Sequence, residues 1–195
     1  MPSSFPAAVQ RRPRGFTMIE LITVMVVMGV VGAIGAARFF DKRDTDTSQY
    51  LNQAKSIIRY GQKVAIAQHR NVYVKLSASS VGLCFQQTCT AANVVPAPGG
   101  GNSASSVTKA QCVLGSPAVY VANWMCEAMQ TDVSTVIAAT PALSNGMFYF
   151  DSFGRPYNSN DSAPTSTFTG PLTLSVGGGA STLVVTVTPE TGYVY

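Results

Sequence analysis

The sequence predicts an α+β protein in which a long N-terminal helix packs on a C-terminal antiparallel β-domain. Three observations support this fold class. Residues 16–37 form an apolar run in which Glu20 is the only charged residue. Apolar residues then recur at intervals of three and four up to about residue 68, as in an amphipathic helix. After Asn71 the chain changes to short segments rich in β-branched and aromatic residues, which are typical of strands.

These features divide the chain into four consecutive parts. We expect a leader peptide at residues 1–15, a transmembrane or filament-core helix at 16–37, its amphipathic continuation at 38–70, and a β-rich globular domain at 71–195. A length of 195 residues is consistent with one domain plus an anchor.

The first helix is predicted from the run between Phe16 and Ala37. A helix of 22 residues is about 33 Å long, enough to cross a hydrocarbon core of about 30 Å. A secretory signal peptide has a shorter apolar region, of about 7–15 residues, and ends in a small-residue cleavage site that Ala33 and Ala36 only imitate. The arginines at positions 11, 12 and 14 favour a cytoplasmic leader by the positive-inside rule.

Glu20 is the residue that an ordinary membrane anchor does not explain. A carboxylate inside a membrane span costs about 2.5–3.5 kcal/mol, and such residues are usually functional. Its position near the edge of the bilayer lowers this cost without removing it. We therefore expect Glu20 to pair with a positively charged partner.

The stretch RGFTMIEL at residues 14–21 resembles the processing site of type IV prepilins and pseudopilins. The resemblance implies that a prepilin peptidase cuts between Gly15 and Phe16 and that the new N-terminal Phe16 is N-methylated. It also implies that Glu20, the fifth residue of the mature chain, pairs with the N-terminal amine of a neighbouring subunit during assembly. The placement of Gly15 and Glu20 favours this interpretation over a twin-arginine signal at Arg11-Arg12.

The same resemblance implies the partners and the location of the chain. The expected partners are other pilin or pseudopilin subunits, the prepilin peptidase, and the inner membrane with its assembly platform. The expected location is a single pass in the inner membrane with a periplasmic C-terminal domain, followed by a pilus or a type II secretion pseudopilus. No cofactor is implied.

The second half of the helix is predicted to pack its apolar face on the globular domain. Polar residues at 41–47, with Asp44 to Thr47 offering N-cap chemistry, predict a break or kink between the two halves. His69, the only histidine, is interpreted as a helix-end residue near the C-terminal dipole rather than a metal ligand.

The β-domain is predicted from short segments that alternate or are rich in β-formers. A surface loop is expected at residues 91–106, which are rich in Ala, Pro, Gly and Ser. A hairpin is expected around Gly177 to Gly179. The predicted strands are 72–76, 81–85, 119–121, 147–150, 172–176, 183–187 and 191–195.

A second resemblance comes from the C-terminal half. It rests on the segment from Phe150 to Pro156, which is followed by a strand hairpin and by Thr-Gly-Tyr-Val at 191–194. It is similar to a minor-pilin group that includes the H-type pseudopilins of type II secretion and the minor pilins of mannose-sensitive-haemagglutinin-type pili. The turn itself has a structural explanation: Asp151 bonds backbone amides ahead of it, Gly154 takes a positive φ, and Pro156 fixes the exit. We assign no chemistry to Asp151 or Arg155.

Four cysteines follow the helix, at Cys84, Cys89, Cys112 and Cys126. On the side expected to be periplasmic they are disulfide candidates, with three possible connectivities. Cys84–Cys89 with Cys112–Cys126 is the most local of these. A four-cysteine zinc site is disfavoured because the paired Cys-x-x-Cys spacing is missing.

Composition argues against an enzyme and against nucleic-acid binding. The formal net charge of +4 includes the three leader arginines, so removing the leader leaves 4 − 3 = +1. Past Arg70 the basic residues are Lys75, Lys109 and Arg155, too few to neutralise clustered phosphates. With one histidine and no phosphate-binding loop, no catalytic site is visible. One alternative is a DNA-binding minor pilin, which the few basic residues disfavour. Another is an adhesive minor pilin that acts through residues 91–131. Within that region, Trp124 and the nearby methionines Met125 and Met129 are better explained as core residues.

Overall fold

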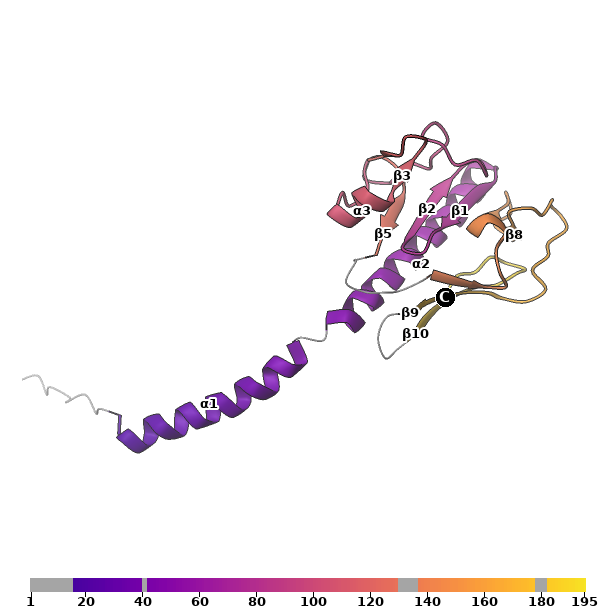
Figure 1. Cartoon of the computed structure of the whole chain (residues 1–195). Helices are drawn as coiled ribbons and strands as arrows, with labels where there is room; N and C mark the ends of the chain where they lie inside the picture. The colour runs from indigo at the N-terminus through magenta and orange to yellow at the C-terminus, as the bar shows by residue number, and fades with distance from the viewer. Residues whose placement is uncertain (1–15, 40–41, 130–136, 178–181) are drawn as a thin grey trace, which may run out of the picture. The chain divides into compact units, whose positions relative to one another are not determined.

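The computed structural model describes residues 16–39, 42–129, 137–177 and 182–195 (Figure 1). It forms two compact units, residues 1–41 and residues 42–195. The predicted leader at 1–15, and Gly15 with it, lies outside the described residues.

Helix α1 (Met18–Phe39) is the described element of the first unit. Large apolar side chains are exposed on all its faces, since consecutive residues from Val24 to Met28 are each about half exposed or more. The single acidic residue of its first turn is Glu20. In the ranges that the structure describes, no helix has the combination of length and apolarity needed to cross a membrane. The span expected at 16–37 therefore stays a prediction.

Helix α2 (Lys42–Gln68) buries one stripe of side chains, as its spacing predicts. Because its helical residues begin at Lys42, the stretch Asp44 to Thr47 lies inside the helix and does not cap it, contrary to expectation. The chain leaves α2 through His69, which has a positive φ of 50° and donates its backbone N–H to the Ile66 carbonyl. The buried stripe of α2 consists of Tyr50, Ala54, Ile57, Ile58, Val64 and Ala65.

The described residues of the second unit form three antiparallel sheets. The largest has five strands in the order β5-β2-β1-β7-β8, the second has the order β10-β9-β6, and the third is the pair β3-β4. The five-stranded sheet comprises β1 (Val72–Leu76), β2 (Ser80–Cys84), β5 (Cys126–Ala128), β7 (Met147–Phe150) and β8 (Pro156–Asn158). The other strands are β3 (Val113–Leu114), β4 (Val119–Tyr120), β6 (Ile137–Thr140), β9 (Leu172–Gly177) and β10 (Thr182–Val187).

The core lies between α2 and the two larger sheets. Ile57 and Ile58 of α2, Val72 and Val74 of β1, and Phe148 of β7 belong to one buried cluster. Strands β9 and β10 contribute to the same cluster, so α2 is the element on which both sheets are assembled.

Most of the predicted strands are present, and the hairpin β9–β10 has the expected antiparallel pairing. The predicted last strand at 191–195 is wrong in extent, because only Val194 forms a bridge there, with Val187. The predicted loop at 91–106 is largely irregular and ends where α3 (Ser106–Gln111) begins, capped by the Ser105 side chain. Strands β3, β5, β6 and β8 and helix α3 were not predicted.

A row of three tyrosines crosses the five-stranded sheet. Tyr73, Tyr149 and Tyr157 occupy paired positions on β1, β7 and β8, with ring centroids 5.1 and 5.2 Å apart. The Tyr149 hydroxyl donates to the Asp161 carbonyl at 3.1 Å. Burial raises the pKa of both Tyr149 and Tyr157, because a phenolate is poorly solvated there.

This burial predicts a loss of stability at high pH. The folded state keeps phenol protons that the unfolded chain releases above its ordinary pKa of about 10. Stabilisation from these groups is therefore fully present below pH 10 and declines as the pH rises further. Urea unfolding of the disulfide-bonded protein between pH 8 and 11 measures the effect. The Tyr149→Phe variant should show a shallower decline, and an equally steep one would contradict this assignment.

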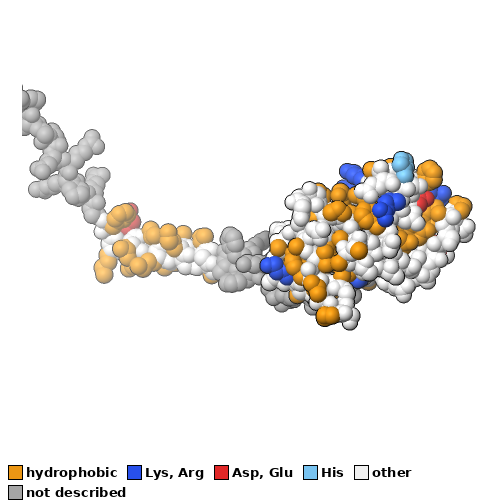
Figure 2. Space-filling view, turned by 90° about the horizontal axis from the view of Figure 1, so that it is seen from above, with side chains coloured by type: hydrophobic (Ala, Val, Ile, Leu, Met, Phe, Trp, Pro, Cys, Tyr) orange, Lys and Arg blue, Asp and Glu red, His pale blue; other side chains and the backbone are white. Residues whose placement is uncertain are grey.

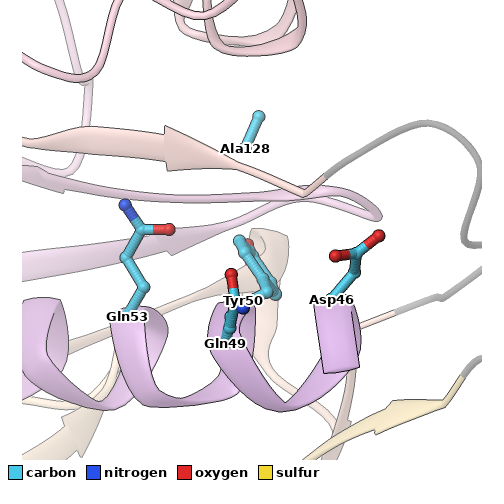
Figure 3. Close-up of a pocket in the computed structure, with 5 residues that line it drawn as sticks. All are labelled: Asp46, Gln49, Tyr50, Gln53 and Ala128. Carbon is cyan, nitrogen blue, oxygen red and sulfur yellow. The ribbon is translucent and has the colours of Figure 1, made fainter. Parts of the chain in front are cut away.

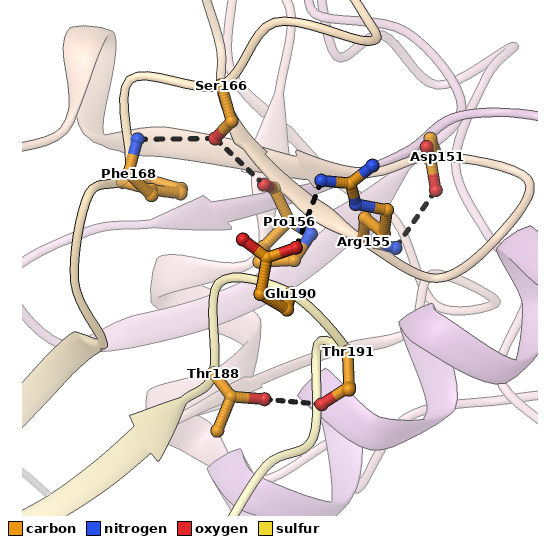
Figure 4. Close-up of polar contacts among 8 residues, drawn as sticks. All are labelled: Asp151, Arg155, Pro156, Ser166, Phe168, Thr188, Glu190 and Thr191. Carbon is orange, nitrogen blue, oxygen red and sulfur yellow. Dashed lines mark hydrogen bonds and ion pairs between the residues drawn. The ribbon is translucent and has the colours of Figure 1, made fainter.

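The turn between β7 and β8 is fixed by Asp151, as the sequence predicts (Figure 4). Its carboxylate accepts hydrogen bonds from the backbone N–H groups of Phe153 and Arg155, both at 2.9 Å, and the residue is only 6% exposed. Gly154 has a φ of 80°, as expected. The Arg155 guanidinium contacts the exposed Glu190 carboxylate at 3.3 Å.

Asp151 and Arg155 should therefore contribute very differently to the free energy of unfolding. Asp151→Ala removes two hydrogen bonds to a buried carboxylate, and we expect a loss of about 2 kcal/mol. Arg155→Ala breaks an exposed ion pair and should cost less than about 1 kcal/mol. Urea unfolding of both variants tests this difference; equal losses would show that the ion pair, not the turn, holds this region.

Candidate functional site

The start of α1 brings Phe16, Thr17 and Glu20 together. Thr17 precedes the helix, and the Glu20 backbone N–H reaches the Thr17 carbonyl at 3.1 Å and its hydroxyl at 3.4 Å. The Thr17 hydroxyl in turn points to the Glu20 carboxylate at 3.5 Å. The Thr-x-x-Glu spacing is that of a capping box, which sequence reasoning missed, but here the carboxylate accepts from the Thr17 hydroxyl and not from its backbone N–H. A carboxylate in this position is also favoured by the helix dipole.

The Glu20 carboxylate lies in an otherwise apolar surface. With Phe16, Leu21 and Val24 it lines a shallow pocket of about 190 Å³. Phe16 is 81% exposed. Figure 2 shows the acidic side chain among hydrophobic ones on this helix. No cation pairs with Glu20 among the described residues, so the site offers one unpaired negative charge on a surface that favours apolar contacts.

The four candidate cysteines form two disulfides, Cys84–Cys89 and Cys112–Cys126. These are the most local of the three possible pairings. The bonds leave no thiolates for the zinc site considered above, and the described residues contain no group of three or more His, Cys, Asp or Glu that could hold a metal.

A second, smaller core surrounds the Cys112–Cys126 bond. It contains Trp124, which is 2% exposed and donates its indole N–H to the Leu83 carbonyl at 2.8 Å. A Cβ added at Gly82 would lie 2.5 Å from the indole ring, so this close approach requires glycine. Met129 is also buried. The predicted core role is confirmed for Trp124 and Met129, whereas Met125 is only partly buried against the main core.

Three basic side chains of the globular unit have structural contacts. Arg59 donates two hydrogen bonds to the Val194 carbonyl, at 3.0 and 2.7 Å. The Arg70 guanidinium lies 3.9 Å from the centre of the Phe85 ring. Arg155 pairs with Glu190. These contacts tie α2 and the turns to the domain.

Glu127 is a buried carboxylate that the sequence did not single out. It accepts hydrogen bonds from the Ser103 N–H and hydroxyl, each at 2.6 Å, and from the Thr108 hydroxyl at 3.0 Å. It therefore fastens the loop before α3 to strand β5. A single Glu between Cys126 and Ala128 carries no pattern that would predict this role.

Comparison with known proteins gives one informative match. Residues 10–36 match the family described as the prokaryotic N-terminal methylation motif. No curated protein matches the chain by sequence.

Among solved structures, two crystal forms of the type IV minor pilin FimU of Pseudomonas aeruginosa are similar to the chain. One is 10% identical with a TM-score of 0.44, covering 80% of this chain and 87% of that one. The other is 11% identical with a TM-score of 0.42, covering 78% and 90%. Because these values are low, the assignment rests on the N-terminal match.

The matched segment includes Gly15, Phe16 and Glu20, and it overlaps the apolar helix whose first turn carries the unpaired carboxylate. Over residues 10–36 the chain therefore carries the prokaryotic N-terminal methylation motif, as the resemblance at residues 14–21 predicts.

Proposed function

We propose that this chain is a minor type IV pilin or pseudopilin that enters a pilus or a type II secretion pseudopilus through α1. The observation that carries the proposal is the methylation motif over residues 10–36, with Glu20 in the first turn of an apolar helix. Apolar side chains around that helix need a cover of lipid or of other helices, and a filament core supplies the second.

Processing precedes assembly in this proposal. A prepilin peptidase cuts after Gly15, Phe16 becomes the methylated N-terminus, and the leader stays on the cytoplasmic side of the inner membrane. The globular unit then lies in the periplasm, where an assembly platform receives the subunit. Two disulfides support this location because such bonds persist in oxidising compartments.

Assembly depends on the Glu20 carboxylate and a new positive charge. Cleavage at Gly15 creates an N-terminal amine on Phe16 of every subunit. An amine of one subunit that reaches Glu20 of the next would neutralise a carboxylate that is costly in an apolar setting. The subgroup with H-type pseudopilins or haemagglutinin-type minor pilins stays a prediction from the turn at Asp151 to Pro156.

The experiment is an intact mass of the native protein from its own membrane, before and after reduction. The proposal predicts a chain that begins at methylated Phe16 and gains about 4 Da when two disulfides are reduced. A mass that retains residues 1–15 would indicate an ordinary anchored protein, and a chain starting near Ala37 would indicate secretion. Either result would overturn the proposal.

A variant at the cleavage site provides the matched test. Gly15→Leu should abolish processing and leave the full-length mass, whereas Ser3→Ala, far from the junction, should be cut normally. A mature mass from Gly15→Leu would show that the junction lies elsewhere.

A further inference from the structure

Phe153 is an exposed aromatic residue at the tip of the turn between β7 and β8. Its side chain is 82% exposed, although the turn around it is fixed by the Asp151 carboxylate. The turn also packs on the end of α2, where a Cβ added at Gly154 would lie 2.8 Å from the Ile66 side chain. Single exposed apolar residues are common on protein surfaces, so Phe153 is informative only if a matching hollow exists.

A hollow of matching chemistry lies on the same globular unit, between the β1–β2 turn and the segment that joins β6 to β7. Its volume is about 310 Å³. A cavity of about 150 Å³ with apolar walls binds benzene, so this hollow, which we call the Leu143 hollow, admits a phenyl ring. None of the described residues that line it is charged, and Ser77 is the one with a polar side chain. The other lining residues are Leu76, Ala78, Ala139, Ala142, Leu143 and Gly146.

A second hollow, between α2 and β5, does not fit an aromatic side chain. Its volume is about 90 Å³, and Asp46, Gln49 and Gln53 line it from α2 (Figure 3). An apolar group placed there would remove water from a carboxylate and two amides without replacing their hydrogen bonds. The Leu143 hollow is therefore the better match for Phe153.

Phe153 and the Leu143 hollow lie at opposite ends of β7. Gly146 directly precedes this strand and Asp151 directly follows it. The five residue steps between them span about 17 Å of extended chain, so Phe153 does not reach the hollow of its own chain. A contact between two copies would join these unlike surfaces. Contacts of that kind generate open helical filaments when the rotation between copies does not close a ring.

We propose that the Leu143 hollow binds Phe153 of a second copy of this chain. The inference rests on the proposed function, because the contact is too small to join two free subunits. An aromatic side chain buries about 150–250 Å², whereas a stable interface buries about 1,600 Å² in total. Subunits already joined through α1 are at a high effective concentration, at which so small a contact forms. The contact then fixes the orientation of neighbouring globular units in the filament.

Photo-crosslinking in sheared filaments tests the contact, with p-benzoylphenylalanine in place of Phe153 of the full chain. Irradiation adds a C–H bond of the neighbour across the benzophenone carbonyl, so one C–C bond forms and the carbonyl becomes a hydroxyl. We expect a covalent dimer of twice the subunit mass, linked to residues 76–78 or 139–146. The same group in place of Val119, which is 60% exposed on β4, is the control and should not give this link. No dimer, or a link from residue 153 to another protein or another surface, would overturn the proposal.

Two substitutions test the contact from its two sides. Phe153→Ala removes the ring, and Ala142→Phe fills the hollow from an exposed position on its wall. Each should raise the release of subunits from filaments into mild detergent about tenfold, and Phe153→Ala should leave the unfolding midpoint unchanged. Val119→Ala, the control, should not change the release. The double variant should be released no faster than either single one, because both remove the same contact. Additive effects, or a lower midpoint in Phe153→Ala, would overturn the proposal.

The outcomes separate this inference from the proposed function. Filaments that contain the mature chain but give no dimer through residue 153 overturn the contact alone. A chain that is absent from filaments overturns both, because the contact requires subunits that are joined through α1.

Discussion

Glu20→Ala is expected to leave cleavage after Gly15 intact while reducing incorporation into the filament at least tenfold. The peptidase junction precedes the substitution and is unchanged. Assembly, however, loses the carboxylate that pairs with the N-terminal amine of a neighbour. Close charge pairs at protein interfaces contribute about 1.5–7 kcal/mol, and each 1.4 kcal/mol corresponds to a tenfold change. The measurement compares the amount of mature protein in sheared filaments with that left in the membrane.

Three further variants separate charge from helix capping. Glu20→Gln keeps the size of the side chain and removes its charge, so it should fail like Glu20→Ala. Thr17→Ala removes the hydroxyl that faces Glu20 but keeps the carboxylate, and should assemble nearly normally. Leu21→Ala, the neighbour in the same pocket, controls for lost apolar area. Normal incorporation of Glu20→Gln would show that pairing with an amine is not required.

The helices were predictable because their signals are local. An apolar run and a stripe with 3.6-residue spacing report directly which faces are buried, and both α1 and α2 appear where these patterns lie. The Asp151 turn was predictable for the same reason, since Asp, Gly and Pro act within a few residues of one another.

The missed strands depend on partners that are distant in the chain. Strand β5 is three residues long and pairs with β2, more than forty residues earlier. Strand β8 pairs with β7 although it begins at a proline. Such short segments have little intrinsic preference and adopt extended structure because a neighbouring edge offers hydrogen bonds. Likewise, the contacts of Glu127 with Ser103 and Thr108 could not be predicted, because these residues meet only in the folded domain.

Removing the Cys112–Cys126 bond is expected to destabilise the globular unit by about 3 kcal/mol on the chain-entropy model for a loop of about 15 residues. The Cys84–Cys89 bond closes a shorter loop, with a sequence separation of 5. Its removal should therefore lower the free energy of unfolding by only about 2 kcal/mol. The variants are the double substitutions to alanine, C112A/C126A and C84A/C89A. Urea unfolding followed by the fluorescence of Trp124, the only tryptophan, measures both losses.

Packing should increase the difference in stability loss between C112A/C126A and C84A/C89A. Cys112 and Cys126 are both fully buried in the cluster around Trp124, so their replacement also leaves poorly filled space beside the indole. Cys84 belongs to the same cluster and is also fully buried, but its partner Cys89 is only half buried, so C84A/C89A removes one buried side chain and C112A/C126A removes two. The emission of folded C112A/C126A should therefore shift further to the red than that of C84A/C89A, because more space opens beside the indole. Equal losses of stability and equal spectra would contradict a special role for the Trp124 cluster and would leave loop closure as the sole contribution of both disulfides.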